Sequence, residues 1–371
     1  MRDSQRIPEL DSLRGIASLL VMIHHNLLAS NLMVGPLFVL TSTPFSAIFT
    51  GRHAVMFFFV LSGFVLTRSL GRFGARSDWR DWIGWIAQRT VRLCLPGFVS
   101  LVISAFLYGA VYDGTWDSEG WWLSSTLWQS PPSVASIIEQ GLGLRSTLRY
   151  EGNNVLWSLA HEWHISIFLP IVATFAWLRL RSSATAMLFL AIGLAGAAGG
   201  DKLTSIGVGA GAIDFLRSTA YFVLPFCFGV AIERLGLMEI RATMVQTVAA
   251  WIAAFGLCRF ANDLSDYAFS VIMIWLAGQP GLFARVLRQT VLAWLGRVSF
   301  SLYLVHELVL AVLHHLLHGA VAPWLILVLS CCLALVAAQI FYSVIERRSH
   351  HLARWIQRSL RGQALPAVVP S

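Results

Sequence analysis

Ten apolar runs, each about as long as a helix that crosses a lipid bilayer, follow one another along the chain. A spanning helix needs about 20 mostly apolar residues, because each residue adds only about 1.5 Å along the helix axis. The sequence reaches this length near residues 15–34, 53–70, 93–112, 155–178, 184–200, 213–232, 243–260, 266–283, 290–313 and 320–344. This pattern predicts an all-α fold, a polytopic membrane helix bundle with about ten transmembrane helices.

The composition agrees with that fold. Hydrophobic residues make up 57% of the chain and charged residues 12%, whereas soluble domains average about 45–50% and about 25%. The mean hydropathy is +0.68. The first apolar run carries two histidines and has no convincing small-residue cleavage site, so we expect a retained first span and not a cleaved signal peptide.

The basic residues predict how the bundle is oriented. With ten spans and the N-terminus in the cytoplasm, 21 of the 27 Lys and Arg residues fall on the cytoplasmic side. Cytoplasmic loops of membrane proteins are enriched in these residues, so both termini are expected in the cytoplasm. The net charge of +8 is then explained by orientation, and no nucleic-acid partner is expected.

The cysteines do not suggest a metal site. All five lie in or beside apolar runs and none forms a C-x-x-C pair, which is typical of small buried side chains and not of zinc ligands or a disulfide framework. They are Cys94, Cys227, Cys258, Cys331 and Cys332. No metal cofactor is expected.

Ionisable residues inside the first apolar run are the first candidates for function, because such groups are costly in a membrane. In "LDSLRGIASLLVMIHHNLL", Arg14 and His25 are eleven residues apart. They therefore share one helix face, with His25 about 16 Å deeper, while His24 points about 100° away. His25 suits general-base chemistry near neutral pH. A neutral imidazole hydrogen-bonded to a neighbouring helix explains the residue equally well.

Other polar groups stand at similar places. Glu162 lies inside the apolar run "NVLWSLAHEWHISIF", where a carboxylate could orient a histidine or serve as a structural contact. Arg89 and Arg92 are three residues apart and could grip phosphates or anchor the helix at the membrane surface. His306 and Glu346 are weaker candidates, for which helix packing is the simpler interpretation.

The segment between the third and fourth spans, residues 113–154, is expected outside. It carries four tryptophans, which usually form an interfacial belt but could also stack on sugar rings. They are Trp116, Trp121, Trp122 and Trp128.

The blocks that carry these residues resemble acyltransferase family 3, the integral-membrane acyltransferases of polysaccharides and related acceptors. They are "LDSLRGIASLLVMIHH", "FFFVLSGFVL", "RTVRLCLP", "LWSLAHEW" and "LGRVSFSLYLVHE", in the family's order and over most of the chain. The family's arginine-then-histidine signature falls on Arg14 and His25, its paired arginines on Arg89 and Arg92, and its glutamate on Glu162. His161 departs from the pattern, because the family usually has a smaller or apolar residue there.

The resemblance implies a membrane acyltransferase domain over residues 1–346, followed by a basic cytoplasmic tail over 347–371, in the cytoplasmic (inner) membrane of a bacterium. It implies transfer of an acyl group, with acetyl expected, from acyl-CoA to a hydroxyl of a glycan or related acceptor. The expected partners are the acyl-CoA donor, membrane lipid, the acceptor and glycan-assembly proteins. Many relatives carry a hydrolase-like domain after the last span, and here the sequence given stops about 25 residues later.

These roles follow for the candidate residues. His25 would accept the proton of the acceptor hydroxyl, and Glu162 would position or charge-balance a reacting histidine or the acceptor. Arg14, Arg89 and Arg92 would hold the phosphates or the pantetheine arm of CoA. Two alternatives remain: a transporter or flippase for a lipid-linked sugar, and an inactive relative that scaffolds glycan assembly.

Overall fold

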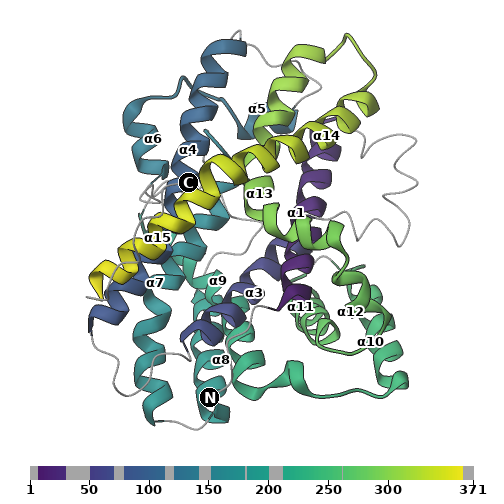
Figure 1. Cartoon of the computed structure of the whole chain (residues 1–371). Coiled ribbons are helices and arrows are strands. Elements are labelled where there is room, and N and C mark those ends of the chain that lie inside the picture. The colour runs from purple at the N-terminus through teal and green to yellow at the C-terminus, as the bar shows by residue number, and fades with distance from the viewer. Residues whose placement is uncertain are drawn as a thin grey trace.

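The computed structural model describes residues 7–30, 51–70, 79–112, 121–141, 152–179, 182–199, 212–260 and 262–361. Within these ranges the regular elements are all helices, which confirms the predicted all-α class (Figure 1). The helices are α1 (Pro8–Ala29), α3 (Gly51–Leu70), α4 (Trp79–Val111), α5 (Trp121–Thr126), α6 (Val134–Gly141), α7 (Leu156–Arg179), α8 (Ser182–Gly199), α9 (Ala212–Leu235), η4 (Leu237–Glu239), α10 (Met244–Leu257), α11 (Asp263–Ala277), α12 (Leu282–Leu287), α13 (Thr290–Leu317), α14 (Pro323–Phe341), η5 (Tyr342–Glu346) and α15 (Arg347–Leu360).

Each of the ten predicted spans overlaps one of these helices. Among the described residues, five helices are long and apolar enough to cross a membrane. They are Gly51–Leu70, Trp79–Val111, Leu216–Leu235, Thr290–Leu317 and Pro323–Leu360. A multi-pass membrane protein is supported, while the ten crossings and the cytoplasmic termini stay predictions.

Two helices begin well before the predicted spans. α1 begins at Pro8, because proline suits the first helical position and acidic residues (here Glu9 and Asp11) suit the first turn. α4 begins at Trp79, because its first turns pack against α15 and not against loops. The apolar pattern marks the membrane-length part of a helix and misses these polar extensions.

α1 and α13 run in parallel and touch through their backbones. A Cβ atom added to Gly15 would lie 2.6 Å from the amide nitrogen of Gly296, so any side chain there would force the helices apart. Farther along, the Ser18 hydroxyl donates to the carbonyl oxygen of Ser299 at 2.9 Å. The two helices thus stay in register toward the positions where each carries a histidine.

α3 is held against its neighbours in a similar way. Added Cβ atoms at Gly63 and Gly229 would each lie 2.0 Å from a carbonyl oxygen of the opposite helix, so α3 and α9 cross at their closest approach there. At its start, α3 is fixed to α11, because Arg52 pairs with Asp263 and with Asp266, its Nε lying 2.6 Å from Asp266 Oδ2. These contacts keep α3 buried at the centre of the bundle.

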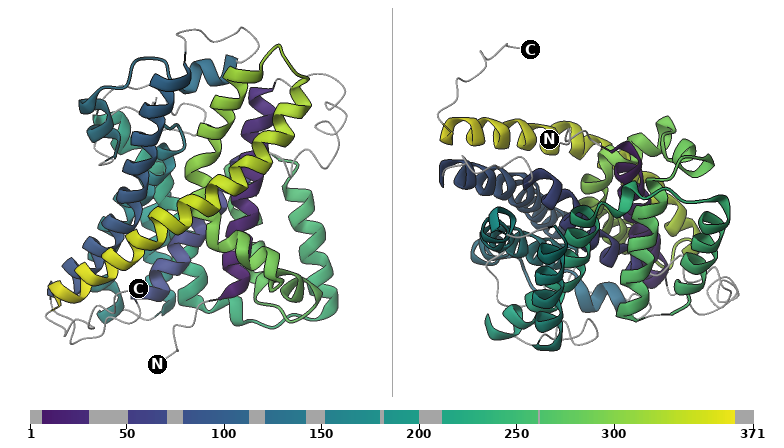
Figure 2. Two further views of the ribbon diagram at one scale, coloured as in Figure 1. Left: turned by 45° about the horizontal axis from the view of Figure 1, so that its top comes forward. Right: turned by 90° about the horizontal axis from the view of Figure 1, so that it is seen from below.

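α14 and α15 form one long helix that crosses a face of the bundle (Figure 1). A π-helical turn, η5, joins them and places Glu346 on the inner side, where it is buried. α15 lies alongside the first half of α4 (Figure 2), with the Ser349 hydroxyl donating to the Val91 carbonyl at 3.0 Å and an Arg361–Asp81 ion pair at 3.1 Å. The start of the predicted tail is therefore packed as a wall of the bundle.

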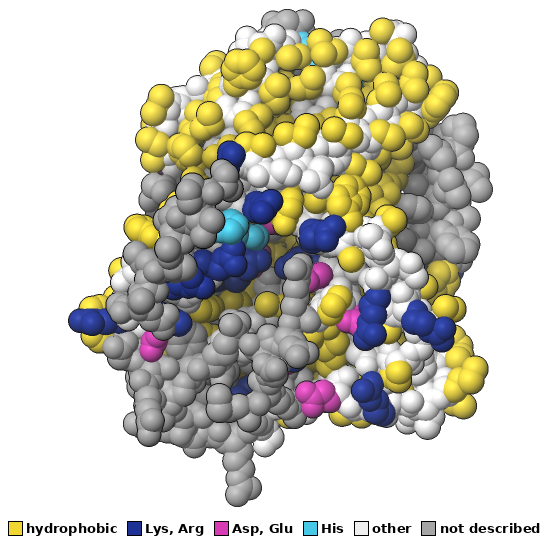
Figure 3. Space-filling view, viewed as in Figure 1, with side chains coloured by type: hydrophobic (Ala, Val, Ile, Leu, Met, Phe, Trp, Pro, Cys, Tyr) yellow, Lys and Arg dark blue, Asp and Glu magenta, His cyan; other side chains and the backbone are white. Residues whose placement is uncertain are grey.

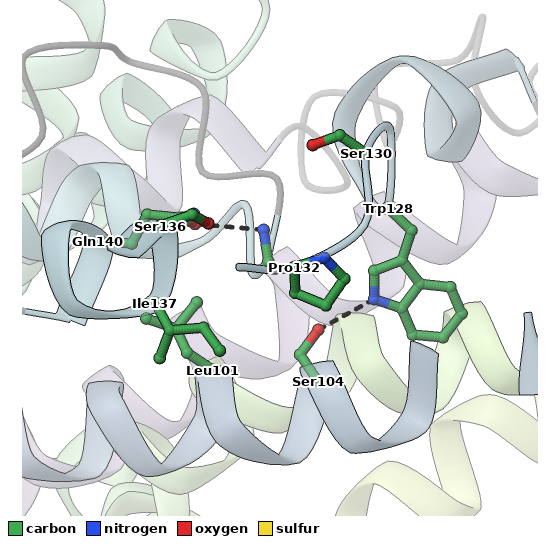
Figure 4. A pocket seen from close by; sticks show the side chains of 9 residues that line it. Leu101, Ser104, Trp128, Ser130, Pro132, Ser136, Ile137 and Gln140 are labelled. Atoms are coloured by element: carbon green, nitrogen blue, oxygen red, sulfur yellow. Dashed lines mark hydrogen bonds between the residues drawn. The ribbon is translucent and has the colours of Figure 1, made fainter. Parts of the chain in front are cut away.

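α5 and α6 belong to the predicted outer loop, of which residues 113–120 and 142–151 lie outside the described residues. This loop is fixed to α4, since the indole Nε1 of Trp128 donates to the Ser104 hydroxyl at 2.9 Å (Figure 4). The cavity between them measures about 10 Å³, room for about one water. It is too small for a substrate.

Candidate active site

A cavity of about 480 Å³ lies between α1, α3, α4, α7, α13 and the junction of α14 with α15. This volume falls within the ~300–1,000 Å³ typical of small-molecule sites. Four of the five predicted site residues line it: Arg14, Arg89, Arg92 and Glu162. Figure 3 shows arginine and histidine side chains gathered around a hollow on the face that α14 and α15 cross.

Glu162 is bound to an arginine. Its Oε1 accepts a hydrogen bond from Arg89 Nη2 at 2.7 Å and another from the Ser62 hydroxyl at 2.8 Å. Both side chains of the ion pair are less than a fifth exposed, so its geometry is well fixed and removing either partner would leave a charge in a poorly hydrated place. The serine of "FVLSGF" thereby helps to orient the carboxylate.

Arg92 differs from Arg89, because it makes no hydrogen bond or ion pair within the described part of the chain, although Glu346 lies in its surroundings. Its exposed surface faces the cavity that it lines. Arg14 is tied to Asp11 at 2.6 Å, one helical turn away. Further basic side chains line the same cavity: Arg297, His350 and Arg354. This excess of positive charge suits a ligand with several negative charges.

His25 lies in a separate cluster on the far side of the arginines. Its Nδ1 is 2.9 Å from Nε2 of His306 and 3.1 Å from Oε1 of Glu307. Glu307 also accepts from the Asn154 side chain at 3.3 Å, and the Trp122 ring packs on His25 with centroids 4.7 Å apart. His306 and Glu307 are almost completely buried.

The hydrogen bonds of this cluster assign the tautomer of His25. Nδ1 of His306 is 3.0 Å from the Leu302 carbonyl oxygen, which only accepts, so this nitrogen carries the proton. Nε2 of a neutral His306 is then an acceptor, and Nδ1 of His25 must donate to it and to Glu307. The lone pair of His25 is left on Nε2, which has no hydrogen-bond partner among the described residues. A histidine held in this way can accept a proton at Nε2.

The cavity and the histidine cluster are adjacent but separated. The lining residues end at Ser18 on α1 and at Tyr303 on α13, one turn before His306. The Tyr303 hydroxyl lies 2.7 Å from that of Ser158, which donates to the Val155 carbonyl at 3.2 Å, so Tyr303 is the donor in the pair. Both side chains are buried, and together they close the inner end of the cavity.

The structure divides the predicted residues into two groups. Arg14, Arg89, Arg92 and Glu162 surround the cavity, whereas His25 lies beyond it. The carboxylate beside His25 is that of Glu307, which sequence reasoning missed, although "VHE" places it next to His306 within an apolar run. His24 packs against Gly51 at the start of α3, and His161 bonds Thr219 on α9 at 2.8 Å, so both join helices.

His25, His306 and Glu307 place their ligating atoms within 4.8 Å of one another, as a metal site also would. Hydrogen bonds through the single Nδ1 proton of His25 account for both of its short distances, while Oε2 of Glu307 is buried without a hydrogen-bond partner among the described residues.

Comparison with known proteins identifies the family of the chain. A family model described as an acyltransferase domain matches residues 7–343, nearly the whole chain. No curated protein and no solved structure gives a significant match.

Proposed function

The chain belongs to this acyltransferase family, and from that premise we propose that it moves an acyl group, with acetyl expected, from acyl-CoA to a hydroxyl of a glycan or related acceptor. The observation that best supports this is the placement of His25. It is a histidine with a free Nε2, backed by a buried carboxylate, and it lies just beyond the Tyr303–Ser158 pair at the inner end of the arginine-lined cavity, so transfer would require these two side chains to move apart. The cavity suits an anionic donor and the histidine suits activation of a hydroxyl.

In the proposed reaction Nε2 of His25 takes the proton of the acceptor hydroxyl while its oxygen attacks the thioester carbonyl carbon. The tetrahedral intermediate then collapses, the carbon–sulfur bond breaks, and the CoA thiolate takes the proton back from the imidazolium. Glu307 and His306 fix the ring through its Nδ1 proton, and the negative charge of Glu307 stabilises the cation that forms. This assigns to Glu307 the task that the sequence suggested for Glu162.

The arginines would bind the phosphates of CoA. Arg92 and Arg14 present guanidinium groups to the cavity, and Glu162 holds Arg89 in place beside them. Arg14 and His25 are eleven residues apart on one helix, so the pantetheine arm would cover about 16 Å between phosphates and base. Contact of Glu162 with the acceptor stays part of the proposal, as do a bacterial inner-membrane location and partners in glycan assembly.

We expect acetyl-CoA to stabilise the purified protein in nanodiscs and to release free thiol when acceptor is present. A ligand that binds only the native state at 100 times its Kd stabilises it by about 2.7 kcal/mol. Thermal unfolding with acetyl-CoA, CoA and adenosine 3′,5′-bisphosphate, together with a thiol assay, checks this. If well-folded protein responds to none of them, a transporter or flippase for a lipid-linked sugar becomes the better explanation.

Arg92→Ala is expected to raise the KM for acetyl-CoA about tenfold with kcat nearly unchanged, because one charge-assisted hydrogen bond contributes about 1.5 kcal/mol or more. The measurement is steady-state kinetics of thiol release. Arg285→Ala is the matched control, since Arg285 is an exposed arginine on α12 that does not line the cavity. Equal effects in both variants would show that general charge, and not a site at Arg92, attracts the donor.

Arg89→Ala is a poorer probe of the same idea. It leaves Glu162 without its ion-pair partner at a half-buried position, and breaking a buried pair typically destabilises a protein by about 3–5 kcal/mol. A loss of donor binding in that variant would therefore be mixed with a loss of stability.

A further inference from the structure

A second hollow of about 360 Å³ adjoins the cavity. It lies between the end of α3, the first turns of α4 and the end of α15. The two spaces share Val65, Gln88, Arg89 and Arg92 as lining residues, so they are continuous at the paired arginines. The proposed reaction uses the cavity and its inner end and leaves this outer hollow without a task.

Three polar side chains in the hollow lack partners. The amides of Gln88 and Gln357, and the indole Nε1 of Trp85, make no hydrogen bond within the described residues. Trp85 is only 6% exposed, so its unpaired N–H is a donor in an otherwise buried ring. Gln88 and Gln357 are partly exposed, and none of the three groups is a buried atom without a partner, so all three are available to a ligand in the hollow.

Along α4, the polar side chains lie at distances from the paired arginines that suit the base of a nucleotide whose phosphates bind those arginines. Gln88 lies one turn from Arg92, about 6 Å along the helix axis. Trp85 lies about 10 Å from Arg92 along the same axis. Gln357 faces them from α15, next to Gly84. Among the described residues that line this hollow, the one carboxylate is Asp81, which pairs with Arg361 at 3.1 Å. A nucleotide with its phosphates at Arg89 and Arg92 would therefore place its purine or pyrimidine ring among the glutamine amides, and the ring would not meet an unpaired carboxylate.

We propose that this hollow binds the adenosine end of the donor, with Gln88 and Gln357 reading the purine edge and Trp85 donating to the nucleotide. The inference rests on the proposed function. A glutamine amide offers a donor and an acceptor that match the amino group and ring nitrogen of adenine, a pairing known from nucleic-acid recognition. Phosphates would then lie at the arginines, and the pantetheine arm would enter the cavity.

The test compares acetyl-CoA with acetyl-1,N6-etheno-CoA, whose added ring blocks the amino edge of adenine, and with acetyl-phosphopantetheine, which has no nucleoside. The wild type should show a KM about tenfold higher for the etheno donor. Gln357→Leu should raise the KM for acetyl-CoA about tenfold and bring the two donors within about twofold of each other. The KM for acetyl-phosphopantetheine and kcat should not change.

Gln289→Leu is the matched control, because Gln289 is exposed at the start of α13 and its side chain makes no capping hydrogen bond within the described part of the chain. If Gln357→Leu unfolds at a lower temperature than the wild type, the same comparison of donors is made with Gln88→Leu instead. Equal use of both CoA donors by the wild type, or unchanged discrimination in the folded variants, would overturn the inference while the acyltransferase stands. If the wild type turns over no acyl-CoA at all, the proposed function itself fails.

Discussion

His25→Gln is expected to lower kcat for acyl transfer by about 10²- to 10⁴-fold, the range in which a positioned general base contributes. The glutamine amide can still donate to Glu307 and His306, but it has no basic nitrogen to take the proton of the acceptor. The KM for acetyl-CoA should change little, since the arginine-lined cavity does not include His25. Steady-state kinetics with acceptor, and thermal stabilisation by acetyl-CoA, separate the two quantities.

His24→Gln is the control for this change, because it alters the same residue type at the adjacent position. Its ring packs against Gly51 at the start of α3, whereas it is His25 that pairs with Glu307. We expect this variant to keep its activity within a few-fold of the wild type. If activity were retained in His25→Gln and lost in His24→Gln, the assignment of His25 as the base would be wrong, and His24 would be the better candidate.

Glu307→Gln is expected to lower kcat by about 10²-fold while the protein stays folded. The amide keeps the shape of the side chain and its contact with Asn154, but it removes the charge that stabilises protonated His25. Loss of one partner of a buried charge pair commonly corresponds to about 2–5 kcal/mol. The effect should be smaller than that of His25→Gln, because His306 still accepts from Nδ1 of His25.

The double variant tests whether the two residues act together. If Glu307 works only through His25, then His25→Gln with Glu307→Gln should be no more than about threefold slower than His25→Gln alone, because residues that act as a unit are not additive. Losses that multiply would indicate that Glu307 contacts the substrate independently. Glu162→Gln serves as the comparison, because the carboxylate of Glu162 bonds Arg89 and Ser62 in the arginine-lined cavity and not the histidine cluster.

The sequence predicted the helical class well, because a membrane helix must satisfy its own backbone and so shows a long apolar run. Arg14, Arg89, Arg92 and Glu162, which the sequence singled out, surround one cavity, and their roles stay a prediction. Helix boundaries were less accurate. The start of α1 has local signals in Pro8, Glu9 and Asp11 that an apolar-run criterion ignores, and the first turns of α4 pack against α15, a long-range contact that no local pattern records.

The pairing of His25 was beyond the sequence. His25 and Glu307 are 282 positions apart, and what brings them together is the glycine contact between α1 and α13, at Gly15 and Gly296. Glu162 was the nearer candidate, because it lies within a recognisable block, yet it belongs to a different level of the bundle. The inward position of Glu346, which lines the cavity, was equally hard to predict, because the π-helical turn that carries it has no clear signature in the sequence.

If the chain carries out the proposed transfer, the hydrogen bond between Tyr303 and Ser158 would limit hydrolysis of the acyl donor by water. A base that can activate an acceptor hydroxyl can also activate water, and a thioester attacked by water is lost. His25 does not line the arginine-lined cavity, so in the proposed reaction water in the cavity would not meet this base, and water beside His25 would not meet the thioester. If the proposed transfer is correct, hydrolysis would require the same displacement of Tyr303 as transfer, and the donor would be protected while the Tyr303–Ser158 hydrogen bond holds.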